Sequence, residues 1–384
     1  DNILIAPAPY SAPSAYYFPT MGRMHAVEVL KGPAAISQGP YTIGGALNLV
    51  STPIGNRSKI DVFAETGSDA TQRVQLDGHK IVNDQVSLLI ESHHWRSDGF
   101  QTIDRSDSDT GLSLDDYTGK VRVRSKDGRH QVLVKLQSTE QSSNQSYLGL
   151  TDQDFRQEPN RRYGLSSLDT IDTDHRQQLI QYRFEASPRT QWVLALYNND
   201  HARNWFKTDK LDADGSRAND PFSGQNWLSV IQTVNLAEDP TEAQWYQSVL
   251  AGTADTAPGS IKLRANARHY FSRGVQATLN HEFQTQAVDY SFEAGLRLHE
   301  DGEDRLQRDS TYHQEGGRLI LDDLGQWGNA GNRIQTAEAL AAYFQGRIAF
   351  KSLVISPGLR FEDIHQFRTR WETRFDKTLD PASR

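Results

Sequence analysis

The side chains best suited to metal chemistry in this sequence are the histidines between residues 79 and 94. His93 and His94 are adjacent, and His79 lies upstream. Imidazole nitrogens are common ligands of transition metals, so this group invites a metal-binding interpretation. Neighbouring residues of a strand point to opposite faces, however, so His93 and His94 cannot chelate one ion without a bulge. We expect polar residues at a strand end and predict no metal site.

Two further motifs lack the partners that their chemistry needs. Residues 212–215 read Asp-Ala-Asp-Gly, like part of a calcium loop, but Lys210 and Pro221 occupy the first and twelfth ligand positions. The Ser-Asp run at 106–109 has no glycine elbow and no histidine at a spacing that suggests nucleophilic catalysis. The sequence therefore predicts no catalytic residue and no cofactor, and we expect that the protein is not an enzyme.

A charged pair inside a glycine-rich segment is more informative. Residues 24–53 read MHAVEVLKGPAAISQGPYTIGGALNLVSTP, with Glu28 inside the first apolar run and Lys31 at its end. The pattern predicts a strand, a turn, a short helical or looped stretch, a glycine turn and a second strand. A nucleotide-binding loop is disfavoured, because GPYTIGG lacks the Gly-x-Gly-x-x-Gly spacing and precedes a strand-like run. A hairpin of an unrelated β protein is the other alternative, with glycines that only supply positive φ.

This segment resembles the plug domain of TonB-dependent outer-membrane receptors. The flanking sequences APAPYSAPSAYYFP and NLVSTPIG are most similar to the ferric dicitrate receptor group. The resemblance implies that the following residues form the plug motif or its contacts with the barrel: Glu28, Lys31, Gly32, Pro33, Gly39, Gly44, Gly45 and Asn48. Because charges enclosed by a barrel must be paired, we hypothesise that Glu28 or Lys31 forms ion pairs with inward-facing wall residues such as Arg347, Arg360 and Glu362. Solvated turn charges are the alternative.

The resemblance also implies where a ligand would bind. In the family, a plug loop at the position of residues 8–18 rises toward the outside, which makes Tyr10, Ser11 and Ser14 candidate ligand contacts. Arginines of the barrel loops are further candidates, namely Arg161 and Arg162 in NRRYG and Arg203, which we expect to begin the longest loop. Guanidinium groups bind carboxylates through paired hydrogen bonds, which suits a ferric citrate type of ligand. The chelator's own oxygens would hold the iron.

Composition is compatible with a barrel that could position these residues. The chain of 384 residues is 36% hydrophobic and 23% charged, with a net charge of -8. A membrane barrel has such averages because only alternate strand residues face lipid. No run of about 18 apolar residues exists, so a membrane-spanning helix is excluded. The negative charge argues against nucleic acid as a partner, and the absence of cysteine leaves no disulfide or thiolate metal site.

Alternation of period two marks roughly thirteen segments from residue 59 onward, fewer than the 22 strands of a plugged transporter barrel. In RTQWVLALYNND, for example, Trp192, Leu194 and Leu196 share one face. Short turns such as SKDGRH alternate with long polar loops, which we place at residues 142–173 and 203–258. Outer-membrane barrels have short turns at one end and long loops at the other, whereas a soluble sandwich has short loops at both ends.

The predicted fold is an all-β membrane protein, a partial transmembrane antiparallel β-barrel with an N-terminal plug segment inside its lumen. We assign residues 1–55 to the C-terminal part of a plug domain and residues 56–384 to the N-terminal part of a truncated barrel. The sequence contains no TonB box and no terminal aromatic strand. We therefore expect an internal fragment of a longer receptor.

The function implied by the resemblance is TonB-dependent uptake of a ferric chelate, either ferric citrate or a similar siderophore. It implies a location in the bacterial outer membrane, in contact with its lipid, and the TonB–ExbB–ExbD complex as the energising partner. Three alternatives remain open from the sequence. They are a TonB-dependent receptor for a vitamin or sugar, a passive porin-like channel, and a secreted carbohydrate-binding or adhesive β protein.

Overall fold

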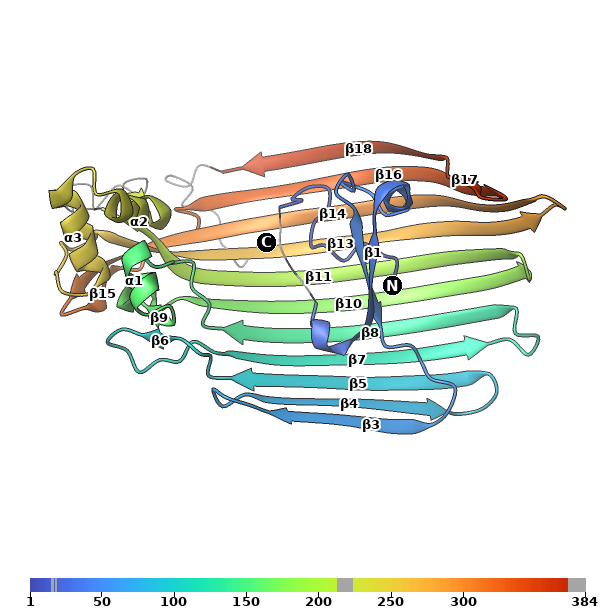
Figure 1. Cartoon of the computed structure of the whole chain (residues 1–384), viewed down its shortest axis with the longest axis horizontal. Helices are drawn as coiled ribbons and strands as arrows, with labels where there is room; N and C mark the ends of the chain where they lie inside the picture. Colours follow the sequence, from blue (N-terminus) through green and yellow to red (C-terminus); the bar gives the residue numbers. More distant parts are fainter. Residues whose placement is uncertain (15–16, 18, 213–223, 372–384) are drawn as a thin grey trace.

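The computed structural model describes residues 1–14, 17, 19–212 and 224–371, so most of the Asp-Ala-Asp-Gly motif lies outside the described residues (Figure 1). Its main feature is a 14-stranded sheet, called the wall below, in which neighbouring strands are antiparallel. The strand order is β17-β16-β14-β13-β11-β10-β8-β7-β5-β4-β3, and β12, β15 and β18 pair with β11, β14 and β16. In the described part of the chain β3 and β18 do not pair with each other, so the wall is open.

The strands of the wall lengthen from one edge toward the middle. Their bounds are β3(Lys59–Thr66), β4(Gln72–Ile81), β5(Val86–Ser97), β7(Leu112–Arg124), β8(His130–Ser143), β10(Thr170–Ser187), β11(Thr190–Leu211), β12(Gln225–Asn226), β13(Ile261–Gln284), β14(Val288–Glu315), β15(Arg318–Asp323), β16(Gly331–Phe350), β17(Leu353–Ile355) and β18(Gly358–Arg370). The predicted alternating segments are therefore confirmed as strands of one sheet.

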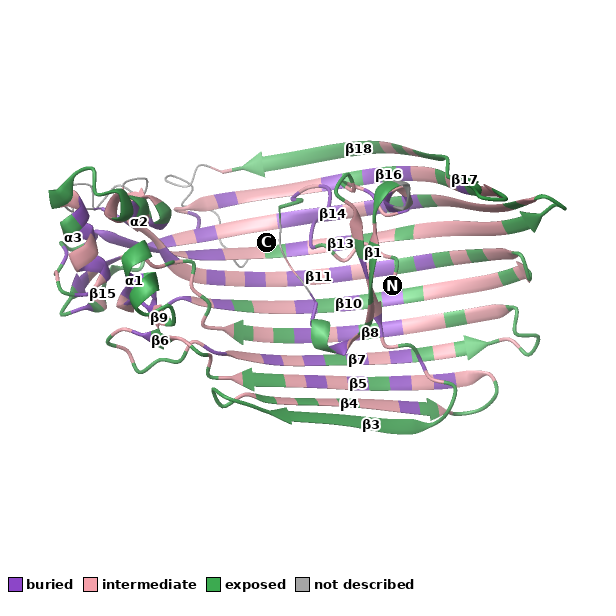
Figure 2. Ribbon diagram, viewed as in Figure 1, coloured by how far each residue is buried: buried purple, intermediate pink, exposed green. Residues whose placement is uncertain are grey.

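Alternation gives the wall two different faces. On β11, Trp192 and Leu194 are exposed, whereas Ala195 and Tyr197 are buried. Large apolar side chains are exposed on the same outer face along many strands: Ile90, Val121, Leu136, Ile180, Leu196, Leu296, Leu298, Leu340 and Phe344. The opposite face, called the inner face, carries buried polar side chains, and Figure 2 shows the resulting bands of burial along the strands.

Connections are short at one end of the wall and mostly long at the other, as predicted. Turns of a few residues join β7 to β8, β10 to β11 and β13 to β14 at the right of Figure 1. At the left, long connections follow β8, β11 and β14. The predicted start of the longest loop at residue 203 is wrong, because β11 continues to Leu211.

The long connections fold into a compact helical cap, defined as residues 144–169 and 224–260. It contains α1(Asp152–Gln157), α2(Trp227–Leu236), α3(Pro240–Leu250), η3(Gly164–Ser166) and the short strand β9(Arg161–Arg162), which pairs with β6(Thr102–Ile103). Apolar side chains from the cap and from the adjoining strand ends form its core: Tyr163, Leu165, Leu211, Trp227, Val230, Tyr246, Val249, Leu250, Ile261, Leu263 and Tyr312. None of the helices in the described ranges has the length and apolar run needed to cross a bilayer.

The described part of residues 1–55, called the N-terminal segment, lies against the inner face of the wall near its middle (Figure 1). Here β1(Met24–Leu30) pairs antiparallel with β2(Ala46–Ser51), and the short helices η1(Met21–Arg23) and η2(Gly32–Ser37) flank β1. The predicted order of strand, turn, short helical stretch, glycine turn and strand is thus confirmed. Gly45 has a φ of +115°, and a Cβ there would lie 2.6 Å from the carbonyl oxygen of Leu30, so only glycine fits this turn.

Candidate functional site

The inner face of the wall binds the N-terminal segment mainly through its backbone. Both carboxylate oxygens of Asp301 on β14 accept from this backbone, at 2.7 Å from Tyr10 N and 2.9 Å from Ser11 N. The side-chain amides of Gln366 and Gln335 donate to the carbonyl oxygens of Tyr10 and Ser11, at 2.7 and 2.8 Å. The backbone N–H groups and the carbonyl oxygens of residues 10 and 11 therefore all form hydrogen bonds with wall side chains.

Tyr10 is the deepest of the three ligand contacts predicted in this loop. Its side chain is fully buried, and its hydroxyl donates to Glu362 at 2.9 Å. Burial, together with the adjacent Glu362 carboxylate, raises the pKa of Tyr10 to about 12, so the phenol stays a hydrogen-bond donor. Ser11 is half-buried, and its hydroxyl has no hydrogen-bond partner among the described residues. Ser14 is exposed.

Two wall arginines hold the end of η2 and the loop that follows it. Arg297 donates to the carbonyl oxygens of Gln38 and Gly39 at 3.0 and 2.9 Å, and Arg360 donates to that of Ile36 at 3.2 Å. A Cβ at Gly39 would lie 2.3 Å from Arg360 Nε, so glycine permits this close approach. In contrast, a Cβ at Gly44 would meet nothing within 4 Å.

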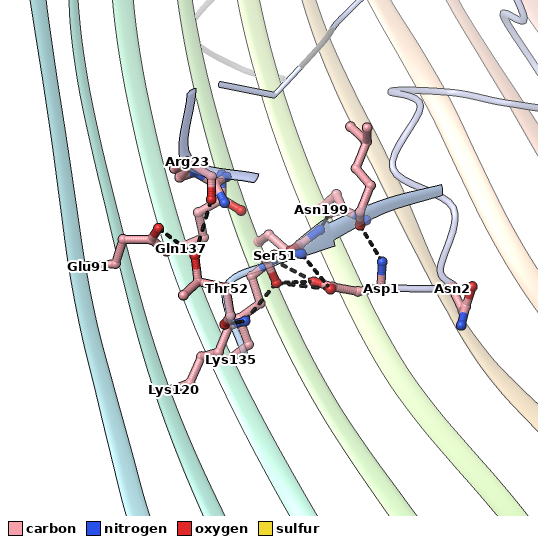
Figure 3. Close-up of polar contacts among 12 residues, drawn as sticks. Asp1, Asn2, Arg23, Ser51, Thr52, Glu91, Lys120, Lys135, Gln137 and Asn199 are labelled. Atoms are coloured by element: carbon pink, nitrogen blue, oxygen red, sulfur yellow. Dashed lines mark hydrogen bonds and ion pairs between the residues drawn. The ribbon is translucent and has the colours of Figure 1, made fainter. Parts of the chain in front are cut away.

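Charged wall residues also enclose the end of the β1–β2 hairpin, as Figure 3 shows. The ammonium group of Lys120 donates to Ser51 Oγ at 2.7 Å, and Lys135 forms an ion pair with Asp1 at 2.9 Å. Thr52 donates to Glu91 at 2.9 Å. These contacts bring three wall strands, β5, β7 and β8, and both ends of the N-terminal segment into one polar network.

One further ion pair between the segment and the wall is completely buried. Arg23 Nε lies 2.7 Å from Asp116 Oδ1, and both side chains have 0% exposure. The other carboxylate oxygen of Asp116 accepts from Thr139 at 2.6 Å. A buried charge that loses its partner is strongly destabilising, so this pair fixes the position of the segment.

A row of arginines crosses the inner face on the cap side of these contacts. In the strand register Arg203 lies opposite Arg268, which lies opposite Arg305, followed by Arg333 and Arg370. Directly opposed residues of neighbouring strands share a face, so five adjacent strands present guanidinium groups on one side. Like charges in this arrangement repel, which is unfavourable unless an anion lies between them.

Glu303 is the carboxylate at the centre of the arginine row. It accepts from Arg268 at 2.8 Å, Arg305 at 3.2 Å and Arg333 at 3.1 Å, and its own side chain is fully buried. Three guanidinium groups thus share one carboxylate, which leaves positive charge in excess within this group. The three arginines remain 13 to 21% exposed, so a ligand can reach them.

The three arginines predicted to lie in barrel loops are found in two different parts of the structure. Arg203 lies inside β11 and joins the row instead of beginning a loop. Arg161 forms ion pairs with Asp104 and Asp154, and Arg162 is buried against the backbone of Asn144, so both belong to the cap.

The predicted plug-to-wall charges also have local contacts. Asn48 donates to Glu28 at 2.7 Å between the two strands of the hairpin, and Lys31 is exposed at the end of β1. In the described residues no ion pair joins Glu28 or Lys31 to the wall. Gly32 has a φ of +63°, and Pro33 lies in η2. Glu28 also lines a cavity of about 310 Å³ with Arg183, Arg297 and Arg360, which is where a rearranged contact would form.

Sequence reasoning missed Arg268, Arg305, Arg333 and Arg370. Each lies at an inward position of an alternating segment, which is the one signal that the sequence contains. Their common row depends on strand register, which turns and bulges set and which a single sequence does not reveal. His93 is buried, whereas the side chain of His94 contacts Asp115 at 2.6 Å. The described residues contain no group of three or more His, Cys, Asp or Glu side chains that could hold a metal ion.

Comparison with known proteins shows likeness in structure rather than in sequence. No protein-family model matches the chain, and a sequence search of curated proteins found no match. Among solved structures, it resembles the unliganded ferric citrate transporter FecA, with a TM-score of 0.68 at 17% identity, over 96% of this chain and 47% of that one. It also resembles the siderophore receptor PiuA from Acinetobacter baumannii, with a TM-score of 0.68 at 12% identity, over 91% of this chain and 48% of that one.

A third likeness is to the pyoverdine outer membrane receptor FpvA from Pseudomonas aeruginosa, bound to pyoverdine. Its TM-score is 0.61 at 13% identity, over 91% of this chain and 48% of that one. The chain therefore spans about half the length of these structures and shares their β-barrel fold over that part, which confirms the predicted partial antiparallel barrel. By name, the three are a transporter and two receptors.

Proposed function

We propose that the chain is part of a TonB-dependent receptor that takes up an anionic ferric chelate, ferric citrate or a similar siderophore, across the bacterial outer membrane. In this proposal residues 1–55 belong to the plug and residues 56–384 to the barrel. The likeness to a ferric citrate transporter and to siderophore receptors supports the general class. The arginine row is the observation that carries the choice of an anionic cargo.

The outer face of the wall supports the membrane location. Large aliphatic and aromatic side chains stand exposed along successive strands, for example Leu194, Leu296 and Phe344. A contiguous apolar surface of this kind is unfavourable in water and favourable against lipid tails. The N-terminal segment on the inner face argues against a passive porin-like channel, because it occupies space through which solutes would diffuse.

The arginine row suits carboxylate-bearing cargo. Guanidinium groups donate two parallel hydrogen bonds to a carboxylate, and several groups in a row bind a polyanion at several points. Iron in such a cargo is held by the chelator, so the protein needs to recognise only the outer carboxylates. In our proposal the TonB–ExbB–ExbD complex then pulls the N-terminal segment from the wall, exchanging its polar contacts for contacts with water.

Replacement of both Arg305 and Arg333 by glutamine in the full-length protein tests this function. We expect binding of ferric citrate to weaken about tenfold or more, because each charge-assisted hydrogen bond contributes about 1.5 kcal/mol or more. Equilibrium binding and uptake of radiolabelled iron are the measurements. Arg273→Gln is the matched control, because Arg273 lies on the outer face of β13, where it pairs with exposed Glu300. Equal binding by the double variant and the control would contradict an anionic cargo at this row.

A further inference from the structure

One strand, β14, contacts both the arginine row and the N-terminal segment through neighbouring inward-facing side chains. The inward-facing residues of β14, at every second position, are Arg297, His299, Asp301, Glu303 and Arg305. Arg297 holds the loop at residues 38–39, Asp301 holds residues 10 and 11, and Glu303 gathers the arginines. The contacts with the segment and with the row therefore lie side by side on one rigid element.

The carboxylate of Asp301 is buried and held in place by hydrogen bonds to both of its oxygens. Its side chain has 0% exposure, and His299 Nε2 lies 3.1 Å from Oδ2. A carboxylate can only accept, so Nε2 carries the proton, and the hydroxyl of Tyr197 then donates to His299 Nδ1 at 2.7 Å. The remaining acceptor capacity of Asp301 goes to the two backbone N–H groups of Tyr10 and Ser11.

The positive row also acts on this buried carboxylate. Residues two apart on one face of a strand are about 7 Å from each other, so Asp301 lies next to Glu303 and its guanidinium partners. Electrostatic interactions at this distance are strong where water is excluded, and the arginines offset the mutual repulsion of the two carboxylates. An anion bound to the row cancels that positive charge and leaves the repulsion uncompensated.

We propose that Asp301 is the positioning residue that couples occupancy of the arginine row to release of residues 10 and 11. With the row empty, attraction to the arginines stabilises the buried Asp301 carboxylate in the position where it holds the two backbone N–H groups of the segment. With an anionic chelate on the row, the buried charge becomes costly, and separation of the segment lets water reach it. This coupling rests on the proposed function for the identity of the anion. The interactions among Asp301, Glu303 and the arginines lie within the protein and do not depend on that identity.

Hydrogen exchange of the full-length protein without ligand gives the first test. In Asp301→Asn we expect exchange of the Tyr10 and Ser11 amides to accelerate about tenfold or more. Asn has one acceptor oxygen, so one of the two charge-assisted hydrogen bonds becomes neutral and the other is lost, because its N–H then faces the amide NH2 group. Glu300→Gln is the matched control, since the neighbouring Glu300 lies on the outer face and pairs with Arg273. Unchanged protection at residues 10 and 11 in Asp301→Asn would overturn the proposal.

The second test leaves Asp301 in place and so remains decisive if its variant fails to fold. Arg305→Gln combined with Arg333→Gln removes positive charge from the row, as a bound anion would. We expect faster exchange at Tyr10 and Ser11 with unchanged protection of β10 and β11. Arg308→Gln, whose arginine stacks on Trp327 at 4.6 Å, is the control. Combined with Asp301→Asn, the double variant should add nothing further, and additive effects would contradict the coupling.

Ferric citrate is the probe for the third test. In the wild-type protein its binding should accelerate exchange at residues 10 and 11. Binding without any change there would overturn the coupling and leave the proposed function standing. Failure of ferric citrate to bind would instead count against the proposed cargo, and the two ligand-free tests would still decide the coupling.

Discussion

The N-terminal segment and the helical cap are both held on the wall, but by different forces. The segment is bound by charged and amide side chains that contact its backbone, by the Arg23–Asp116 pair, and by small apolar clusters such as Ala8 and Ala12 against Tyr270. The cap is bound by one large apolar core, with Trp227, Tyr246 and their neighbours buried together.

Because of this difference, we expect that the N-terminal segment can leave the wall, whereas the helical cap stays attached to it. Apolar contact is favourable in proportion to the area removed from water, so displacing the cap would expose its whole core at once. Backbone hydrogen bonds can be exchanged for hydrogen bonds to water at modest net cost. A segment held in this way can leave the wall while uncovering only small apolar clusters, such as Ala8 and Ala12 against Tyr270.

Removal of a large core side chain from the cap should have the largest effect. Tyr246→Ala deletes a buried ring, and we expect a loss of about 4 kcal/mol of cap stability from lost burial and a cavity. Local stability follows from hydrogen exchange of α2 and α3. Leu228→Ala on α2 is the control, since Leu228 is exposed. If the N-terminal segment loosened as much as the cap, the two regions would not be separate units.

The buried ion pair should be the strongest single attachment of the segment. Asp116→Ala leaves Arg23 charged and unpaired, and we expect the seated state of the segment to lose about 3 kcal/mol. Protease accessibility and hydrogen exchange of residues 19–30 measure this loss. Asp115→Ala is the control, because Asp115 faces outward and contacts His94 and Arg96. Equal effects of the two variants would show that the buried pair has no special part in seating.

Acid should weaken the cap through Asp154. Burial alone would raise the pKa of Asp154, but hydrogen bonds from Tyr163 and Gln247 and the charge of Arg161 outweigh it and hold the pKa below its ordinary value of 3.8. A depressed pKa contributes stability above the unfolded-state value, and this contribution is lost as the pH falls through the folded-state value. We expect about 1.5 kcal/mol of cap stability to disappear on acidification below about pH 4.

Thermal unfolding of the cap between pH 6 and pH 3, followed by tryptophan fluorescence, measures this dependence. Asp154→Asn should flatten it, whereas Asp152→Asn, at an exposed position of the same helix, should leave it intact. The prediction fails if the pH dependence survives in Asp154→Asn.

The smallest effect is expected at Glu28. Glu28 itself is exposed, although its partner Asn48 is buried, and glutamine retains an acceptor oxygen for Asn48, so Glu28→Gln should change seating by less than about 0.5 kcal/mol. Unchanged uptake together with unchanged protection of the hairpin would remove the hypothesis that Glu28 rearranges into a plug-to-wall ion pair during transport. A clear loss of uptake with normal seating would support that hypothesis.

Local features of this protein could be predicted because they depend on neighbours in the chain. The hairpin of residues 24–51 follows from apolar alternation and from Gly45 at its turn, and the strand faces follow from period two, as at Trp192 and Leu194. The arginines show the limit of such reasoning. Arg203 looked like a loop residue because polar residues crowd around it, yet backbone pairing with β13 extends the strand past it.

The sequence by itself determined the fold class, the two faces of the wall and the order of elements in the N-terminal segment. Periodicity and turn residues act over a few positions, so they are present in any stretch of the chain. Only the tertiary structure decided which arginines form one row, that Asp301 meets Tyr10 across some 290 residues, and that Arg23 finds Asp116. Those contacts depend on strand register and on how the segment docks, which are properties of the assembled sheet.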